Sequence, residues 1–203
     1  MTGYIKKDIK YSKKWLLIAL LYCTIVGYVM VREESNSFFF VYFLIPFFLV
    51  QLPLGKLMAM EDHRDTRDFL KRMPQKGWIR VAARELFVSG LLVIGLVCIN
   101  FFEYMEFDGY KFGEGLKVMA ILFLLFLAYF TIEMIVFYRF SYHLAQNSVV
   151  FIIFIALAFS MLEKYLGLTL DINLILNSPI SFIVLIVIDI ILFFIEIKAE
   201  CAG

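Results

Sequence analysis

Six stretches of this chain are apolar and long enough to cross a lipid bilayer, which takes about 20 mostly apolar residues in a helix. They are Trp15–Val31, Phe38–Met60, Leu86–Phe102, Leu116–Tyr138, Ser148–Leu162 and Ile180–Ile197. Backbone polar groups in hydrocarbon must hydrogen-bond within their own segment, so consecutive spans of this kind form helices. The sequence therefore predicts an all-α integral membrane protein, with six transmembrane helices in one domain over residues 1–203.

Composition supports this class. Hydrophobic residues make up 63% of the chain and its mean hydropathy is +0.87, which leaves too little polar surface to cover a soluble globule of 203 residues. The formal net charge is only +1, so no broad basic field favours nucleic acid. Membrane lipid, and not nucleic acid, is the expected environment.

Lysine and arginine counts in the connecting segments predict the orientation, because short cytoplasmic loops carry an excess of both. With the N-terminus inside, the cytoplasmic side receives 15 of the 19 basic residues. The outer side receives the other 4, namely Arg32, Lys111, Lys117 and Lys164. We therefore expect both termini to be cytoplasmic.

Two segments outside the spans have their own character. Within residues 1–14, Ile5, Ile9 and Ser12 fall on one side of a helix and lysines around the other, which predicts an interfacial helix held by anionic lipid headgroups. A basic flank that only sets the orientation is the alternative. Residues 163–179 are too apolar for a free loop, which predicts a short helix or re-entrant segment on the outer face. It either covers an exit path or packs against helix ends.

The most polar segment, Glu61–Glu85, joins spans two and three and carries seven Lys or Arg and five acids. We expect residues 61–78 to form a cytoplasmic loop with a short helix over Asp62–Met73. Four positions at i, i+3, i+4 and i+7 then form a narrow apolar stripe: Thr66, Phe69, Leu70 and Met73. Such a stripe suits either a groove in a soluble partner or the membrane surface.

The polar side of this loop helix is arranged to stabilise it. Asp68 lies four residues from both Arg64 and Arg72, a spacing that allows ion pairs on a helix surface. Pro74 ends the helix, because it lacks a backbone N–H and disfavours helical geometry at the residue before it.

Motifs for chemistry are absent from the sequence. It has no phosphate-binding G-x-x-x-x-G-K-[ST] loop, no H-E-x-x-H and no G-x-S-x-G, and its three cysteines have no paired spacing. We therefore expect neither catalytic residues nor a metal site. Two carboxyls, Glu133 and Asp189, lie within predicted spans, where a charge at the helix centre costs about 2.5–3.5 kcal/mol. They are candidates for a substrate path, or else they form hydrogen bonds that order the bundle.

The loop resembles the first cytoplasmic loop of type-2 ATP-binding-cassette (ABC) transporter permeases. In that pattern a glutamate ends span two, a Gly-Thr follows, then a Leu-Pro with basic residues, then a lysine that enters span three. The matching residues, at intervals of 5, 8 and 10, are Glu61, Thr66, Pro74 and Arg84. Three positions depart from the pattern, with Asp65 for glycine, Met73 for leucine and Arg84 for lysine. The opening Ile5–Lys10 is also similar to that of a compact six-span subfamily.

The resemblance implies a permease subunit of an ATP-driven exporter in a bacterial plasma membrane. Its partners would be an ABC ATPase subunit, which binds the ATP and Mg²⁺, and a second copy or homologous permease chain; this chain itself would hold no cofactor. The loop helix would be the coupling helix that contacts the ATPase, through Glu61, Arg64, Thr66, Phe69, Leu70, Arg72, Met73 and Pro74. The predicted cargo is amphipathic or hydrophobic, for example a peptide toxin or antimicrobial.

Two other functions remain open from the residues. One is a membrane assembly or immunity factor that does not transport and whose basic loop binds lipid. The other is a proton-coupled secondary transporter that uses Asp189 or Glu133, although the sequence shows no pair of interrupted helices.

Overall fold

The computed structural model describes residues 2–32, 38–63, 66, 77–106, 112–147 and 179–202. This part of the chain is helical and contains no strand. Its long helices are α1 (Thr2–Arg32), α2 (Phe38–Glu61), α4 (Gly77–Glu106), α5 (Phe112–Arg139) and α8 (Pro179–Ala202). A short helical stretch over residues 142–147 follows α5.

Four of these helices contain a stretch that is long and apolar enough to cross a membrane. The stretches are Leu44–Glu61, Gly77–Phe101, Leu116–Arg139 and Ile180–Cys201. Helix α1 joins the predicted interfacial segment and the predicted first span in one continuous helix. The predicted span Ser148–Leu162 and the outer segment 163–179, apart from Pro179, lie outside the described residues.

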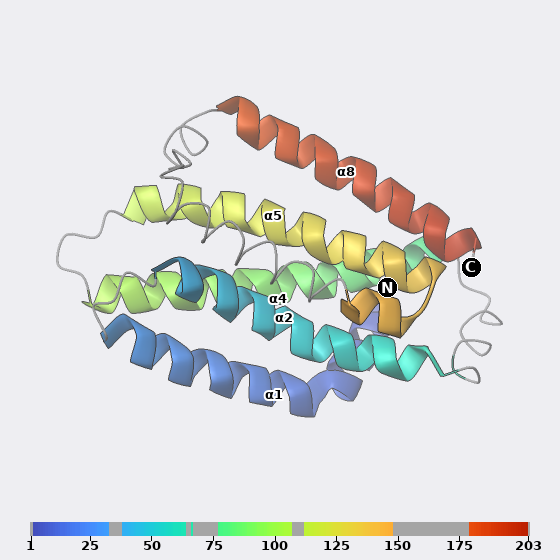
Figure 1. Cartoon of the computed structure of the whole chain (residues 1–203), viewed down its shortest axis with the longest axis horizontal. Coiled ribbons are helices and arrows are strands. Elements are labelled where there is room, and N and C mark those ends of the chain that lie inside the picture. The colour runs from blue at the N-terminus through green and yellow to red at the C-terminus, as the bar shows by residue number, and fades with distance from the viewer. Residues whose placement is uncertain are drawn as a thin grey trace.

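Helix α4 is the centre of the bundle and contacts each of the other four long helices. Figure 1 shows α1 and α8 on opposite sides, with α2, α4 and α5 between them. The start of α1, the end of α2, the start of α4 and the end of α8 all lie at one end of the bundle (Figure 1). The described ends of the chain and the helix ends on either side of the loop after α2 therefore lie at the same end of the bundle.

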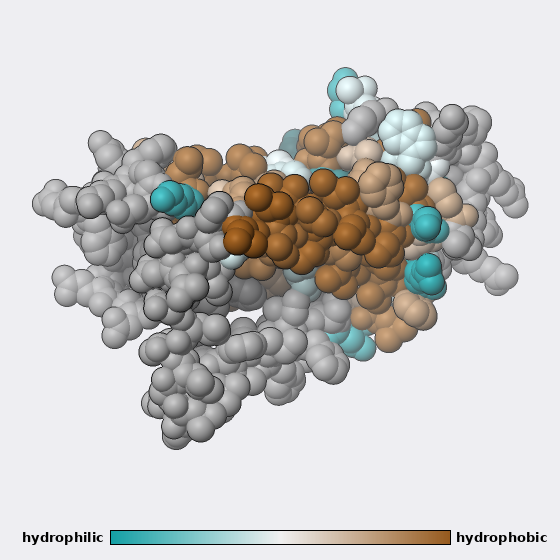
Figure 2. All heavy atoms as spheres, turned by 90° about the horizontal axis from the view of Figure 1, so that it is seen from above, coloured by the Kyte–Doolittle hydropathy of each residue, from teal (hydrophilic) through white to brown (hydrophobic). Residues whose placement is uncertain are grey.

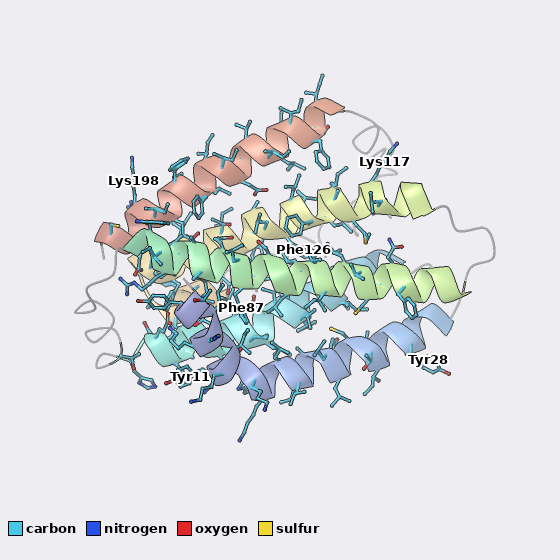
Figure 3. All side chains as sticks on the ribbon, turned by 180° about the vertical axis from the view of Figure 1, so that it is seen from behind. Tyr11, Tyr28, Phe87, Lys117, Phe126 and Lys198 are labelled. Atoms are coloured by element: carbon cyan, nitrogen blue, oxygen red, sulfur yellow. The ribbon has the colours of Figure 1, made fainter. Side chains whose placement is uncertain are left out.

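The core is built from large apolar side chains of α2, α4 and α5. Phe47, Phe130 and Leu92 are almost fully buried, and Phe47 stacks against Phe130 with ring centroids 6.0 Å apart. Figure 3 shows Phe126 among these helices, whereas Lys198 and Tyr28 point away from the bundle. The interior is therefore packed by side chains.

Helices α2 and α4 approach closely at a glycine. A Cβ atom built on Gly95 would lie 3.1 Å from the Pro46 Cα atom and 3.2 Å from the Leu49 Cδ2 atom. Small residues at helix contacts allow such close approach in membrane proteins. Gly95 therefore fixes how closely α4 packs against α2.

Helix α8 is the most exposed of the four spans. Ile180, Ile183 and Phe194 are each more than 60% exposed, and Figure 2, which looks onto α8, shows a continuous apolar surface with hydrophilic residues toward the C-terminal end. Such a surface suits hydrocarbon and not water.

The structure corrects one boundary. The sequence places the start of span three at Leu86, but α4 begins at Gly77, so the charged residues Arg80, Arg84 and Glu85 belong to the helix. They can lie there because each has a polar partner inside the bundle, as described below. The end of α2 at Glu61 agrees with the predicted start of the loop.

Candidate functional site

Two adjacent residues of α4, Arg84 and Glu85, organise two polar clusters on different sides of the helix. Successive residues of an α-helix point about 100° apart. Arg84 contacts acids of α1 and α2, whereas Glu85 contacts α5 and α8. The central position of α4 therefore brings polar side chains from all five long helices together.

Arg84 is the centre of the first cluster and is 5% exposed. Its Nε donates to Asp8 Oδ2 at 3.1 Å, and its Nη2 donates to Glu61 Oε1 at 2.7 Å. The Lys7 ammonium also donates to Glu61 Oε1 at 2.8 Å and lies 3.4 Å from Asp8 Oδ1. Two cations thus balance two anions, as buried charges require. We call Lys7, Asp8, Glu61 and Arg84 the four-residue ion network.

The start of α1 is folded against this network. Tyr4, Asp8 and Ser12 are buried at intervals of four residues, whereas Ile9 is 46% exposed. The Ser12 hydroxyl donates to the Asp8 carbonyl oxygen at 2.6 Å, and the Lys7 ammonium lies 5.5 Å from the centre of the Tyr4 ring. Figure 3 shows α1 bending near Tyr11, so that its first turns cross the end of the bundle. The N-terminal segment therefore has a polar face toward protein as well as lysines toward solvent.

The second cluster lies between α4, α5 and α8. The Thr131 hydroxyl donates to Glu85 Oε1 at 3.0 Å, and Glu196 of α8 lies nearby with neither carboxyl oxygen receiving a hydrogen bond from a described residue. Glu196 is fully buried. One turn beyond it, Glu200 forms an ion pair with Arg80 at 2.6 Å. This cluster is acidic, and its charges are not all paired with cations.

The two predicted intramembrane carboxyls occupy different environments. Glu133 is fully buried on α5 and accepts a hydrogen bond from Gln51 Nε2 of α2 at 2.9 Å. Asp189 lies on the same side of α8 as Glu196, two helical turns away, and both of its oxygens are buried without a hydrogen-bond donor. Glu133 also influences Tyr142, which lies after the end of α5. Burial raises the pKa of the Tyr142 phenol, and the Glu133 carboxylate raises it further. The structure therefore places Glu133 in a contact between α2 and α5 and Asp189 near the acidic cluster.

Few of the predicted loop residues can be placed. Glu61 lies in the ion network at the end of α2, and Thr66 is described as partly buried. The remaining six predicted residues all lie outside the described residues: Arg64, Phe69, Leu70, Arg72, Met73 and Pro74. The coupling-helix assignment thus stays a prediction, and only its first residue has a defined setting.

Several residues of these clusters are missing from the set predicted from sequence. Asp8 is the only acid among the N-terminal lysines, and this isolation was a usable signal. Asp189, Glu196 and Glu200 are spaced i, i+7 and i+11, which places them on one face of a helix. For Gln51, Glu85 and Thr131 the sequence carries no comparable signal. Across the described residues, no group of three or more metal-ligating side chains is found.

Comparison with known proteins gives one result. A family model described as ABC-2 family transporter protein matches residues 3–198 of this chain. No curated protein and no solved structure matches it significantly.

Proposed function

Because the chain belongs to the ABC-2 transporter family, and is therefore a membrane component of a transport system, we propose that it is the permease subunit of an ATP-driven exporter. The observation that carries this proposal is the extent of the match, which covers residues 3–198 of 203. The apolar helices agree with a permease, since four of them can cross a bilayer by length and composition.

We propose further that the ATPase is a separate polypeptide and that it contacts the loop between α2 and α4. The chain has no phosphate-binding loop of its own. The segment 61–78 carries both the family-like residues and the short apolar stripe. A soluble ATPase could reach this loop because the loop joins the ends of two spans at one end of the bundle.

The four-residue ion network gives this loop a mechanical connection to the bundle. Glu61 ends α2 and Arg84 lies about two turns into α4, so their 2.7 Å contact joins the two helices on either side of the loop. Asp8 and Lys7 extend the tie to α1. A force applied to the loop by the ATPase would therefore move three helices together, as a rigid-body switch between two states requires.

The direction of transport and the cargo are also proposals. We propose export of an amphipathic or hydrophobic substrate, such as a peptide, along a path between two permease chains. The support is the scarcity of polar groups on the outer surface of the spans, of which α8 is the clearest case. A strongly polar solute would find few partners there.

The test is co-purification in mild detergent from the native membrane, followed by mass spectrometry and an assay of ATP hydrolysis. We expect a stoichiometric ABC ATPase. In the variant Phe69→Asp with Leu70→Asp, the amount of co-purified ATPase should fall at least tenfold, because the two substitutions place charges on the stripe proposed to contact the ATPase. Phe140→Asp with Leu144→Asp is the matched control, since both of those residues are more than 50% exposed near the same end of the bundle.

Retention of the ATPase by the Phe69 and Leu70 variant would refute the coupling-helix assignment. If the wild-type chain brings down no ATPase, under conditions that keep other such complexes intact, the exporter proposal fails in favour of a lipid-binding membrane factor.

A further inference from the structure

The first turns of α1 carry a group of lysines that takes no part in the ion network. Lys7 belongs to that network, but the other four lysines of the segment are exposed: Lys6, Lys10, Lys13 and Lys14. Because successive residues point about 100° apart, these four lie within about one third of the helix circumference. This arc is opposite the side on which Tyr4, Asp8 and Ser12 are buried. We call the four residues the lysine face of α1.

The lysine face has no anionic partner within the described part of the chain. The ion pairs at this end of the bundle are those of the ion network and of Arg80 with Glu200. Lys10 lies four residues from both Lys6 and Lys14, and like charges at this spacing repel each other and destabilise a helix. An anion bound from outside the chain would relieve this repulsion.

The position of the lysine face along α1 indicates the kind of anion. From Leu17 onward the same side of the helix is apolar, and Leu17, Leu21 and Ile25 are each more than 50% exposed. These residues belong to the predicted span Trp15–Val31, so their surroundings are hydrocarbon. A ligand that fits both parts of this side carries negative charge joined to apolar chains, as an anionic phospholipid does. A soluble acidic protein or a nucleic acid would match the lysines but not the apolar surface beside them.

We propose that the lysine face binds the headgroups of anionic phospholipids in preference to zwitterionic ones, with the acyl chains along Leu17 and Leu21. Lysine suits this position because its apolar stem can lie along hydrocarbon while its ammonium group stays at the headgroup level. The opposite side of the same turns carries Asp8, which accepts from Arg84. Lipid and bundle therefore hold the N-terminal segment from opposite sides. The proposal does not depend on an ATPase partner.

Tryptophan quenching by brominated lipid tests the site, because bromine on an acyl chain quenches a tryptophan that the chain contacts. The full-length chain carries Leu17→Trp as the reporter, with Trp15→Phe and Trp78→Phe to remove its two native tryptophans. It is reconstituted into phosphatidylcholine vesicles that contain either brominated phosphatidylglycerol or brominated phosphatidylcholine at the same mole fraction. We expect the brominated phosphatidylglycerol to bind at least about threefold more strongly at low salt, and this preference should decrease at high salt.

Lysine substitutions in the reporter chain test whether the positive charges cause the preference. The combined variant Lys6→Gln, Lys10→Gln, Lys13→Gln and Lys14→Gln should show no preference. Arginine at the same four positions should retain it, because arginine keeps the charge. Lys117→Gln with Lys198→Gln is the matched control, since both residues are exposed lysines on other helices, and it should also retain the preference. Quenching by brominated phosphatidylcholine shows that each variant is inserted in the bilayer.

Equal quenching by the two brominated lipids, with all lysines in place, overturns the proposal in favour of a basic flank that only sets the orientation. This comparison holds whether or not the lysine variants fold. A preference that persists in the glutamine variant also overturns it. So does an equal preference in a chain with Ile183→Trp as the reporter, because the basic residue of α8, Lys198, lies at the other end of that helix. The preference would then belong to the bilayer and not to the lysine face.

Discussion

Replacing Arg84 with methionine should destabilise the bundle by about 3 kcal/mol. Removing one partner of a buried ion pair costs about 3–5 kcal/mol, because it leaves an uncompensated charge out of water. Arg84 is 5% exposed and contacts Asp8 at 3.1 Å and Glu61 at 2.7 Å. The lower end of the range applies because Lys7 still lies 2.8 Å from Glu61 and 3.4 Å from Asp8. Lys7→Met should cost only about 1 kcal/mol, since that side chain is 26% exposed.

The two tryptophans make this measurable. Trp15 on α1 and Trp78 on α4 lie in the two helices that the network joins, so their fluorescence reports unfolding in detergent micelles or bicelles. Arg84→Lys should be intermediate, because an ammonium cannot form both contacts in the geometry of a guanidinium. If Arg84→Met and Lys7→Met cost the same within about 0.5 kcal/mol, the network is solvated and the reasoning from burial is wrong.

Two other contacts give matched predictions in the same unfolding assay. Gly95→Leu should destabilise the protein by about 1–3 kcal/mol, because the leucine side chain would collide with Pro46. Gly90→Leu is the control and should change stability little, since a Cβ atom at Gly90 meets nothing within 4 Å. Equal effects at both positions would refute the close approach of α4 to α2. Gln51→Leu should lower the stability by about 1–3 kcal/mol, because it removes the hydrogen-bond donor to the buried Glu133. The double variant Gln51→Leu with Glu133→Leu should recover most of that stability. If it recovers none, Gln51 does not stabilise the protein through this hydrogen bond.

Hydrophobic length predicts the helices of this chain well. The predicted spans Phe38–Met60 and Leu116–Tyr138 agree with α2 and α5 to within a few residues, because a helix is the structure that satisfies the backbone in hydrocarbon. The start of α4 could not be found in this way. The predicted span started at Leu86 and so left out Arg80 and Arg84, whose partners on other helices show how these charges are accommodated in α4.

The candidate site was less predictable than the fold. Glu133 and Asp189 stand out in the sequence because each is a charge within an apolar run. Glu196 does not stand out, since it lies near the end of its span, where a charge is ordinary. Its burial depends on α8 packing against α5 and α4, and these contacts join helices that are not consecutive in the chain.

The sequence by itself determined that this is a helical membrane protein and carried the loop pattern of its family, because hydrophobic length and local motifs are properties of consecutive residues. The tertiary structure decided which charges meet. Asp8, Glu61 and Arg84 come from three helices, and their contacts exist because α4 lies between the others. The spacing of residues along the sequence predicts which face of a helix each residue occupies, but it does not predict which other helix packs against that face.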